Sequence, residues 1–162
     1  MAVGDSSSNG SGGYVNIEAR NGASNSGAVT ANGGDGGRFD SNGGGNLGIY
    51  AVSGEANNSG DFTANGGFGG EYGGDGGYFG AEGLTAVNSG NISVNGGNAT
   101  NPGNVYTNTW GGDGGYVEVL GAGLDGEATN TGTVSNAAGT GTTEGDEGCL
   151  HVGALNFEGN CN

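Results

Sequence analysis

The sequence has almost no basic residues. Only two of its 162 residues are Lys or Arg, namely Arg20 and Arg38, against 17 Asp and Glu, so the formal net charge is −15. A nucleic-acid-binding surface needs clustered Lys and Arg to displace the counterions of the phosphate backbone. The composition therefore predicts no nucleic-acid partner. It also predicts no membrane partner, because an anionic membrane would repel so acidic a chain.

Long apolar runs are also missing. Hydrophobic residues make up 31% of the chain, and no run approaches the roughly 20 residues of a membrane-spanning helix. Helical periodicity does not extend beyond one turn, because glycine interrupts every window. Residues 1–5 have neither the basic nor the apolar segment of a secretory signal peptide, so either a leader is absent from this numbering or export is unconventional. The acidic, lysine-free composition nevertheless favours an extracellular or cell-surface location.

Proline is scarce although glycine is abundant. The chain has 44 glycines and one proline, without a Gly-X-Y period, so a collagen-like structure is excluded and disorder is the main competing interpretation. A disordered chain has no reason to repeat apolar residues at matched positions, as this one does at Val29, Phe62, Ile92 and Val134. The pattern therefore favours a folded repeat.

Two short phrases alternate along the chain. The first is a glycine cluster of the form G-x-G/E-G that opens into an alternating strand, and the second begins Asn-Ser/Thr-Gly. Copies of the first begin at Gly10, Gly34, Gly74, Gly112 and Gly145, and copies of the second at Asn25, Asn58, Asn88 and Asn130. Equivalent residues of the first phrase are 24, 40, 38 and 33 residues apart. Such periods are typical of solenoids, propellers and arrays.

Alternation within the phrases predicts short strands. Val29 and Ala31 would face inward while Thr30 faces outward, and later copies repeat this register. A third strand fits between the phrases, at residues 49–52 and 84–87. Glycine and asparagine suit the corners, because they accept positive φ at little cost. We expect an all-β fold with one domain over the whole chain, a parallel β-helix (β-solenoid) of about four to five irregular coils with Gly/Asn-rich corners, preceded by an N-terminal extension at residues 1–9.

The glycine phrases carry a resemblance. Runs from Ala-Asn-Gly-Gly or Val-Asn-Gly-Gly, through a glycine tract, into Gly-Gly-Tyr-Phe or Gly-Gly-Tyr-Val resemble the glycine-rich right-handed β-helix repeats of large bacterial and archaeal surface proteins. The resemblance covers roughly residues 10–157. It implies an extracellular adhesive or structural role and carries over no catalytic residues.

Four aspartates share one position of the first phrase. If the coils are in register, neighbouring carboxylates lie roughly 4.8 Å apart. Such a column would either cap turns through backbone N–H groups or bind Ca²⁺, and the first role is the expected one. The four residues are Asp35, Asp75, Asp113 and Asp146.

The second phrase supplies two further sets of equivalent residues. Its leading asparagines, Asn25, Asn58, Asn88 and Asn130, would form an amide ladder along the solenoid axis. Its outward side chains would form a flat hydroxyl and amide array that is either simply solvated or able to order water or bind glycans. The array comprises Thr30, Asn32, Thr63, Asn65, Ser93, Asn95 and Ser135.

The only two cysteines lie near the C-terminus. Outside the cell, Cys149 and Cys161 would close a short loop and staple the last coil, residues 145–162, for about 3 kcal/mol in the chain-entropy model. Reduced thiols or a bridge from Cys161 to a neighbouring subunit are the alternatives. One histidine, His151, and two cysteines at unsuitable spacing do not predict a zinc site.

Variable spacing predicts loops at residues 41–48, 67–73 and 98–111, and insertions of this kind often lie on a binding face. The last loop carries the only proline and the only tryptophan, so Trp110 is a candidate ligand contact. No spacing selects a catalytic pair from Glu82, Glu118 and the nearby aspartates, and we expect no enzymatic activity and no obligatory cofactor.

The end coils of a solenoid expose unpaired strand edges and apolar core. No amphipathic capping helix is visible at either end of this sequence, so we expect each end to be covered by another copy. The predicted function is a structural subunit of an extracellular filament, with subunit contacts at Val15, Ile17, Val152, Leu155 and Phe157. The alternative is a monomeric adhesin or a glycan- or ice-binding module that uses the polar array or Trp110.

Overall fold

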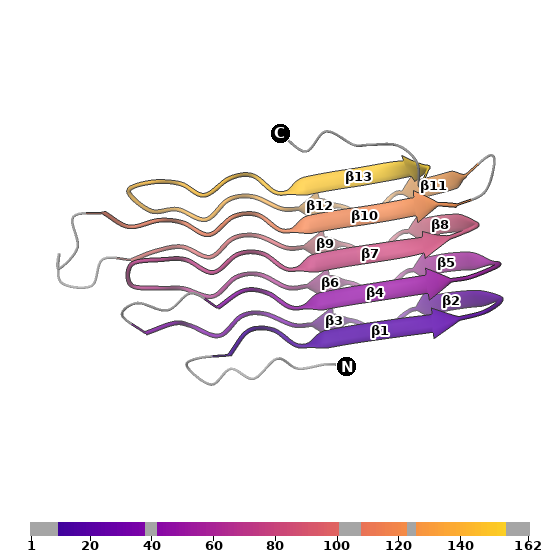
Figure 1. Cartoon of the computed structure of the whole chain (residues 1–162), viewed down its shortest axis with the longest axis horizontal. Coiled ribbons are helices and arrows are strands. Elements are labelled where there is room, and N and C mark those ends of the chain that lie inside the picture. Colours follow the sequence, from indigo (N-terminus) through magenta and orange to yellow (C-terminus); the bar gives the residue numbers. More distant parts are fainter. Residues whose placement is uncertain (1–9, 38–41, 101–107, 123–125, 155–162) are drawn as a thin grey trace.

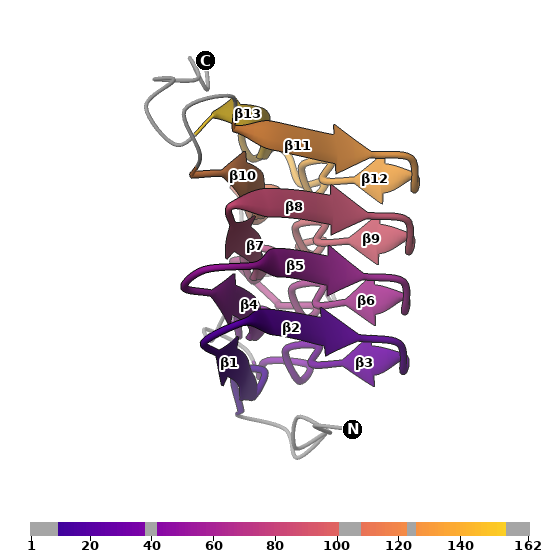
Figure 2. The ribbon, with the colours of Figure 1, turned by 90° about the vertical axis from the view of Figure 1, so that its right-hand side faces the viewer.

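The chain winds into a coil of stacked strands. A computed structural model describes residues 10–37, 42–100, 108–122 and 126–154. They form thirteen β-strands and no helix, arranged as about four turns of a parallel β-solenoid (Figure 1). The chain runs along the front in β1, returns along the back in β3 and rises from the N-terminal to the C-terminal turn, so the coil is right-handed (Figure 2).

Each turn contributes one strand to each of three parallel sheets. The first sheet contains β1 (Tyr14–Ala19), β4 (Asn46–Ala51), β7 (Tyr78–Gly83), β10 (Tyr116–Gly121) and β13 (Cys149–Ala154). The second contains β2 (Gly22–Asn25), β5 (Glu55–Asn58), β8 (Thr85–Asn88) and β11 (Glu127–Asn130). The third contains β3 (Val29–Thr30), β6 (Phe62–Thr63), β9 (Ile92–Ser93) and β12 (Val134–Ser135).

The third strand per turn is present, but its expected copies belong to different sheets. Residues 49–51 lie in β4 of the first sheet, whereas residues 85–88 form β8 of the second sheet. The two expected copies have the same form, Ile-Tyr-Ala-Val at residues 49–52 and Leu-Thr-Ala-Val at residues 84–87. That local pattern cannot distinguish a strand before a corner from one after it.

The turns are more regular than the glycine clusters indicated. Tyr14, Asn46, Tyr78, Tyr116 and Cys149 are register partners in successive turns, and they are 32, 32, 38 and 33 residues apart. The second copy of the glycine phrase, at residues 34–37, was assigned wrongly. The segment equivalent to residues 74–77 is residues 42–45, because Gly44 donates its N–H to the Asp75 carbonyl. Residues 34–37 instead lie beside residues 67–70.

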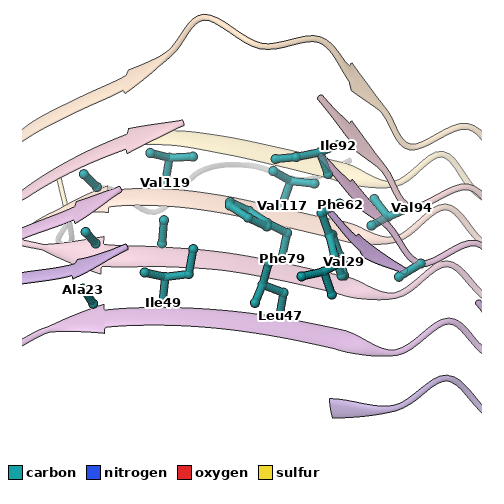
Figure 3. Close-up of a cluster of buried hydrophobic side chains, with 14 of the residues drawn as sticks. Ala23, Val29, Leu47, Ile49, Phe62, Phe79, Ile92, Val94, Val117 and Val119 are labelled. Atoms are coloured by element: carbon teal, nitrogen blue, oxygen red, sulfur yellow. The ribbon is translucent and has the colours of Figure 1, made fainter. Parts of the chain in front are cut away.

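Apolar side chains fill the space between the three sheets. Val29, Phe62 and Ile92 of the third sheet are at most 4% exposed, and they face Leu47 and Phe79 of the first sheet (Figure 3). The expected inward register is therefore confirmed for the second phrase, and Val117 and Val119 also lie inward in β10. The apolar column is shared between turns, as the repeat pattern predicted.

Beyond the third sheet the chain forms two extended, facing segments per turn, which we call the glycine arms (described parts of residues 31–45, 64–77, 94–115 and 136–148). They appear as the wavy segments to the left of the strands in Figure 1. Main-chain hydrogen bonds join the two arms and climb the turns in a zigzag. Gly74 donates to Gly67, Gly97 to Gly74, Gly112 to Gly97 and Gly139 to Gly112, at 2.7–3.0 Å.

Glycine is needed in these arms because the neighbouring main chains leave no room for a side chain, and not because the backbone has a positive φ. Among the described glycines only Gly22 has a positive φ, and its value of 158° is nearly extended. At Gly66 and Gly96, by contrast, a Cβ would overlap the main-chain carbonyl of the facing arm. The expected reason for the glycine content was therefore wrong for most positions, because the backbones themselves pack against one another.

Candidate functional site

The outward polar array lies on the third sheet and the start of the glycine arms, and its oxygens accept hydrogen bonds from the next turn. The N–H of Asn65 donates to Asn32 Oδ1 at 2.9 Å, that of Asn95 to Asn65 Oδ1 at 2.8 Å, and that of Ala137 to Asn95 Oδ1 at 2.9 Å. Ser93 and Ser135 donate their hydroxyls to the same Asn65 and Asn95 oxygens at 2.8 and 2.7 Å.

These asparagines are required because of the glycine arms. The carbonyl of Ala31 turns inward and accepts the N–H of Gly45 across the arm, and Ala64 accepts that of Gly77 in the same way. The N–H of Asn65, in the turn above, therefore cannot use the Ala31 carbonyl as its acceptor. It donates to the side chain of the next residue, Asn32, instead. Burying or orphaning an N–H is costly, so the repeat places a side-chain oxygen there.

The aspartate column follows the same rule, with one correction. Asp113 N–H donates to Asp75 Oδ1 at 3.0 Å, and Asp146 N–H donates to Asp113 Oδ1 at 2.8 Å, so these three residues stack. Asp35 lies outside their column and accepts the N–H of Phe68 at 3.3 Å, because its glycine cluster belongs to the other arm. Within the described ranges, no group of three or more His, Cys, Asp or Glu is placed to hold a metal ion.

The leading asparagines of the second phrase form a continuous amide ladder. Each Nδ2 donates to the Oδ1 of the asparagine one turn above, at 2.8 Å from Asn25 to Asn58 and at 2.7 Å for the next two steps. Each Nδ2 also donates to the carbonyl of the glycine two residues later, for example Asn58 to Gly60 at 2.8 Å. Asn58 and Asn88 are fully buried. The ladder therefore supplies hydrogen-bond partners for the buried amides and for the glycine carbonyls at the corner between the second and third sheets.

Trp110 lies on a glycine arm and stacks on Tyr72 of the turn below. The ring centroids are 5.0 Å apart and the planes differ by 10°. One ring face of Trp110 is therefore already covered. The rest of its expected loop, residues 101–107, lies outside the described residues. A hollow of about 460 Å³ lies along the neighbouring arm against Asp35, Phe68 and Thr100.

The outer face of the first sheet carries four tyrosines that were not singled out from the sequence, namely Tyr14, Tyr50, Tyr78 and Tyr116. The ring of Tyr50 lies over Gly48 and that of Tyr78 over Gly80, and these two glycines are register partners. Tyr78 donates its hydroxyl to Glu118 Oε2 at 2.7 Å and stacks on Tyr116 with centroids 6.0 Å apart. The signal was a tyrosine two residues from a glycine in neighbouring repeats, where the ring covers the surface that glycine leaves bare.

Burial and the Glu118 carboxylate both raise the pKa of the Tyr78 hydroxyl above its ordinary 10.0. A group whose pKa is raised by folding supports stability below its unfolded pKa and loses that contribution as the pH rises further. The pKa of Tyr50 and that of Tyr116 are also raised by burial, but Tyr78 has the largest shift. We therefore expect alkaline titration, followed by tyrosinate absorbance, to show a last-ionising component, from Tyr78, that appears together with unfolding. Tyr78→Phe should remove this late component, whereas Tyr14→Phe, at a residue that is 63% exposed, should leave it in place.

The two ends of the first sheet expose apolar side chains. Leu150 and Val152 of β13 are 46% and 38% exposed, and Val15 and Ile17 of β1 are half-buried. The other expected contacts, Leu155 and Phe157, lie outside the described residues, as do Cys161 and residues 1–9. The disulfide from Cys149 therefore stays a prediction.

Comparisons with models of known protein families, with curated proteins and with solved structures found no match. In the part of the chain that the structure describes, no helix could span a bilayer. The fold and the surfaces described above therefore carry the functional argument by themselves.

Proposed function

We propose that this protein is a structural subunit of an extracellular filament or surface assembly, which grows by head-to-tail stacking of its end turns. The main support is that the first sheet ends in an edge strand on both sides, β1 and β13. Among the described residues, β1 pairs only with β4 and β13 only with β10, so each has one unpaired edge. Exposed strand edges are templates for pairing with another chain.

The apolar columns of the first sheet support this pairing. Within the molecule, Val15 stacks on Leu47 and Ile17 on Ile49, and the same columns end at Leu150 and Val152. A second copy placed with its β1 on β13 would set Val15 over Leu150 and Ile17 over Val152. The contact would repeat the packing found between internal turns. Because the two ends differ, such a heterologous contact yields an open polymer unless its rotation closes a ring.

The resemblance to glycine-rich repeats of secreted surface proteins supports an extracellular location, and the excess of negative charge suits a solvated surface. In this proposal the principal partner is another copy of the chain, glycans are secondary partners, and no catalysis is involved. A monomeric glycan- or ice-binding role has less support. The oxygens of Asn65 and Asn95 already accept internal hydrogen bonds, and Tyr72 covers one face of Trp110.

Substitutions at the ends test the stacking. Leu150→Glu should abolish fibres in negative-stain micrographs, because a carboxylate would be buried against Val15 of the next copy. The matched control is Leu84→Glu, which replaces an equally exposed leucine (46%) on an internal turn and should leave fibres intact. Circular dichroism checks that both variants stay folded.

A mixing experiment separates stacking from general aggregation. Val15→Glu blocks the N-terminal end of the solenoid, whereas Leu150→Glu blocks its C-terminal end. Each of these two variants therefore keeps one end that can stack. Neither should form fibres alone, and an equimolar mixture of the two should stop at dimers in light scattering. A wild-type protein that remains a monodisperse monomer at high concentration would reject the proposal, as would loss of fibres in Leu84→Glu.

A further inference from the structure

A small hollow lies on the outer face of the first sheet, where the strands β4, β7 and β10 end. It has a volume of about 280 Å³ and is lined by Tyr50, Ala51, Val52, Glu82, Gly83 and Ala122. Tyr50 and Glu82 are register partners on neighbouring strands, so the aromatic side chain and the carboxylate lie side by side. Val52 is 68% exposed at the rim and adds an apolar wall.

The chemistry of this hollow matches an alkylammonium group. A cation is attracted both to the face of an aromatic ring and to a carboxylate, while its alkyl chain packs on apolar surface. The Glu82 carboxylate has no hydrogen bond or ion pair with another described residue. The chain offers no lysine of its own to fill the place.

A second carboxylate continues the same column. Glu18 is the register partner of Tyr50 on the other side, so the order along the axis is Glu18, Tyr50, Glu82. Two strand spacings separate the carboxylate-bearing positions, about 9–10 Å. This arrangement fits a linear ligand with two or more separated cationic groups and an aliphatic chain between them.

We propose that this column binds a linear aliphatic polyamine. One ammonium group lies at Glu82 in the hollow, the methylene chain crosses Tyr50 and Val52, and a second ammonium group reaches Glu18. Tyr50, Val52 and Glu82 lie on internal turns, and of the binding residues only Glu18 lies on the end strand β1. Arg20 follows β1 one turn below Val52 and weakens binding by charge repulsion.

Titration of the full chain with spermidine, followed by nuclear magnetic resonance shifts of backbone amides, tests the site. Shifts should centre on residues 50–52 and 82–83. Glu82→Gln and Tyr50→Leu should each raise the dissociation constant about two- to fivefold, whereas Tyr50→Phe, which keeps the ring, should bind as well as the wild type. Arg20→Gln should tighten binding.

Two controls separate this site from general attraction by an acidic protein. Glu127→Gln removes an exposed carboxylate of the second sheet and should leave the dissociation constant unchanged. A neutral diol of similar length should cause no shifts, and Mg²⁺ should not compete at equal ionic strength. Equal weakening by Glu82→Gln and Glu127→Gln, or effective competition by Mg²⁺, would show that only counterion attraction is present and would overturn the proposal.

Discussion

Gly77→Ala is expected to destabilise the fold by at least about 3 kcal/mol, a large part of the total stability of a small domain. A Cβ at Gly77 would overlap the carbonyl oxygen of Gly45 in the turn below and the methyl group of Ala64 across the arm. Neither neighbour can retreat easily. The Gly45 carbonyl accepts the N–H of Tyr78, and Ala64 is fully buried. Chemical denaturation followed by circular dichroism measures the loss.

Gly13→Ala is the matched control, because Gly13 occupies the same repeat position in the first turn. A Cβ there meets no atom within 4 Å, and its φ is not in the left-handed region. The substitution should leave the stability unchanged or raise it by up to about 1 kcal/mol through the unfolded chain. Similar stabilities for the two variants would mean that the glycine arms are not in close main-chain contact.

Asn58→Asp is expected to cost about 3–5 kcal/mol at neutral pH. The Asn58 Nδ2 donates to the Asn88 side chain and to the Gly60 carbonyl, and the residue is fully buried. A carboxylate has no hydrogen to donate, so it would face two acceptor oxygens in a site without water.

The pH dependence of this variant follows from the same geometry. Burial beside two acceptors raises the pKa of the introduced carboxyl above its unfolded value of about 3.9. A carboxyl group whose pKa is raised by folding makes the protein less stable as the pH rises. The loss in free energy of unfolding relative to wild type should therefore be smallest in acid and grow toward neutral pH. Thermal unfolding at several pH values measures it.

Asn32→Asp is the control with the same change of charge. Asn32 is exposed and only its oxygen is used, as acceptor for the Asn65 N–H. Aspartate keeps that acceptor, so the change should stay within about 0.5 kcal/mol at all pH values. If both variants behave alike, the amide ladder does not contribute as its hydrogen bonds indicate.

Much of the cross-section could be predicted from the residues alone. The alternation of Val29 and Ala31 with Thr30 fixes which side faces the core, because a strand places successive side chains on opposite faces. Recurrence of the second phrase places Asn25, Asn58 and its later copies in one column. Those inferences need only local pattern and equal spacing between turns.

The sequence could not show which glycine cluster stacks on which. Both arms of the first turn carry a glycine cluster, Gly-Asp-Gly-Gly at residues 34–37 and Asn-Gly-Gly-Gly at residues 42–45. The first of these matches the phrase at residues 74–77 more closely in sequence although the second is its partner in space, and Asp35 was therefore placed in the wrong column. A glycine has no side chain whose burial could decide between them. The tyrosine face was missed for a related reason, since a tyrosine over a glycine is recognisable only once the neighbouring strand is known.

The sequence by itself determined the fold class, the inward and outward sides of the strands and the presence of stacked repeats, because these follow from periodicity in side-chain polarity. The tertiary structure decided the pairing of the glycine arms and the use of the outward asparagines and aspartates as acceptors for the next turn. Those features depend on main-chain hydrogen bonds between turns. Main-chain groups are the same in every residue, so only their arrangement in space distinguishes one partner from another.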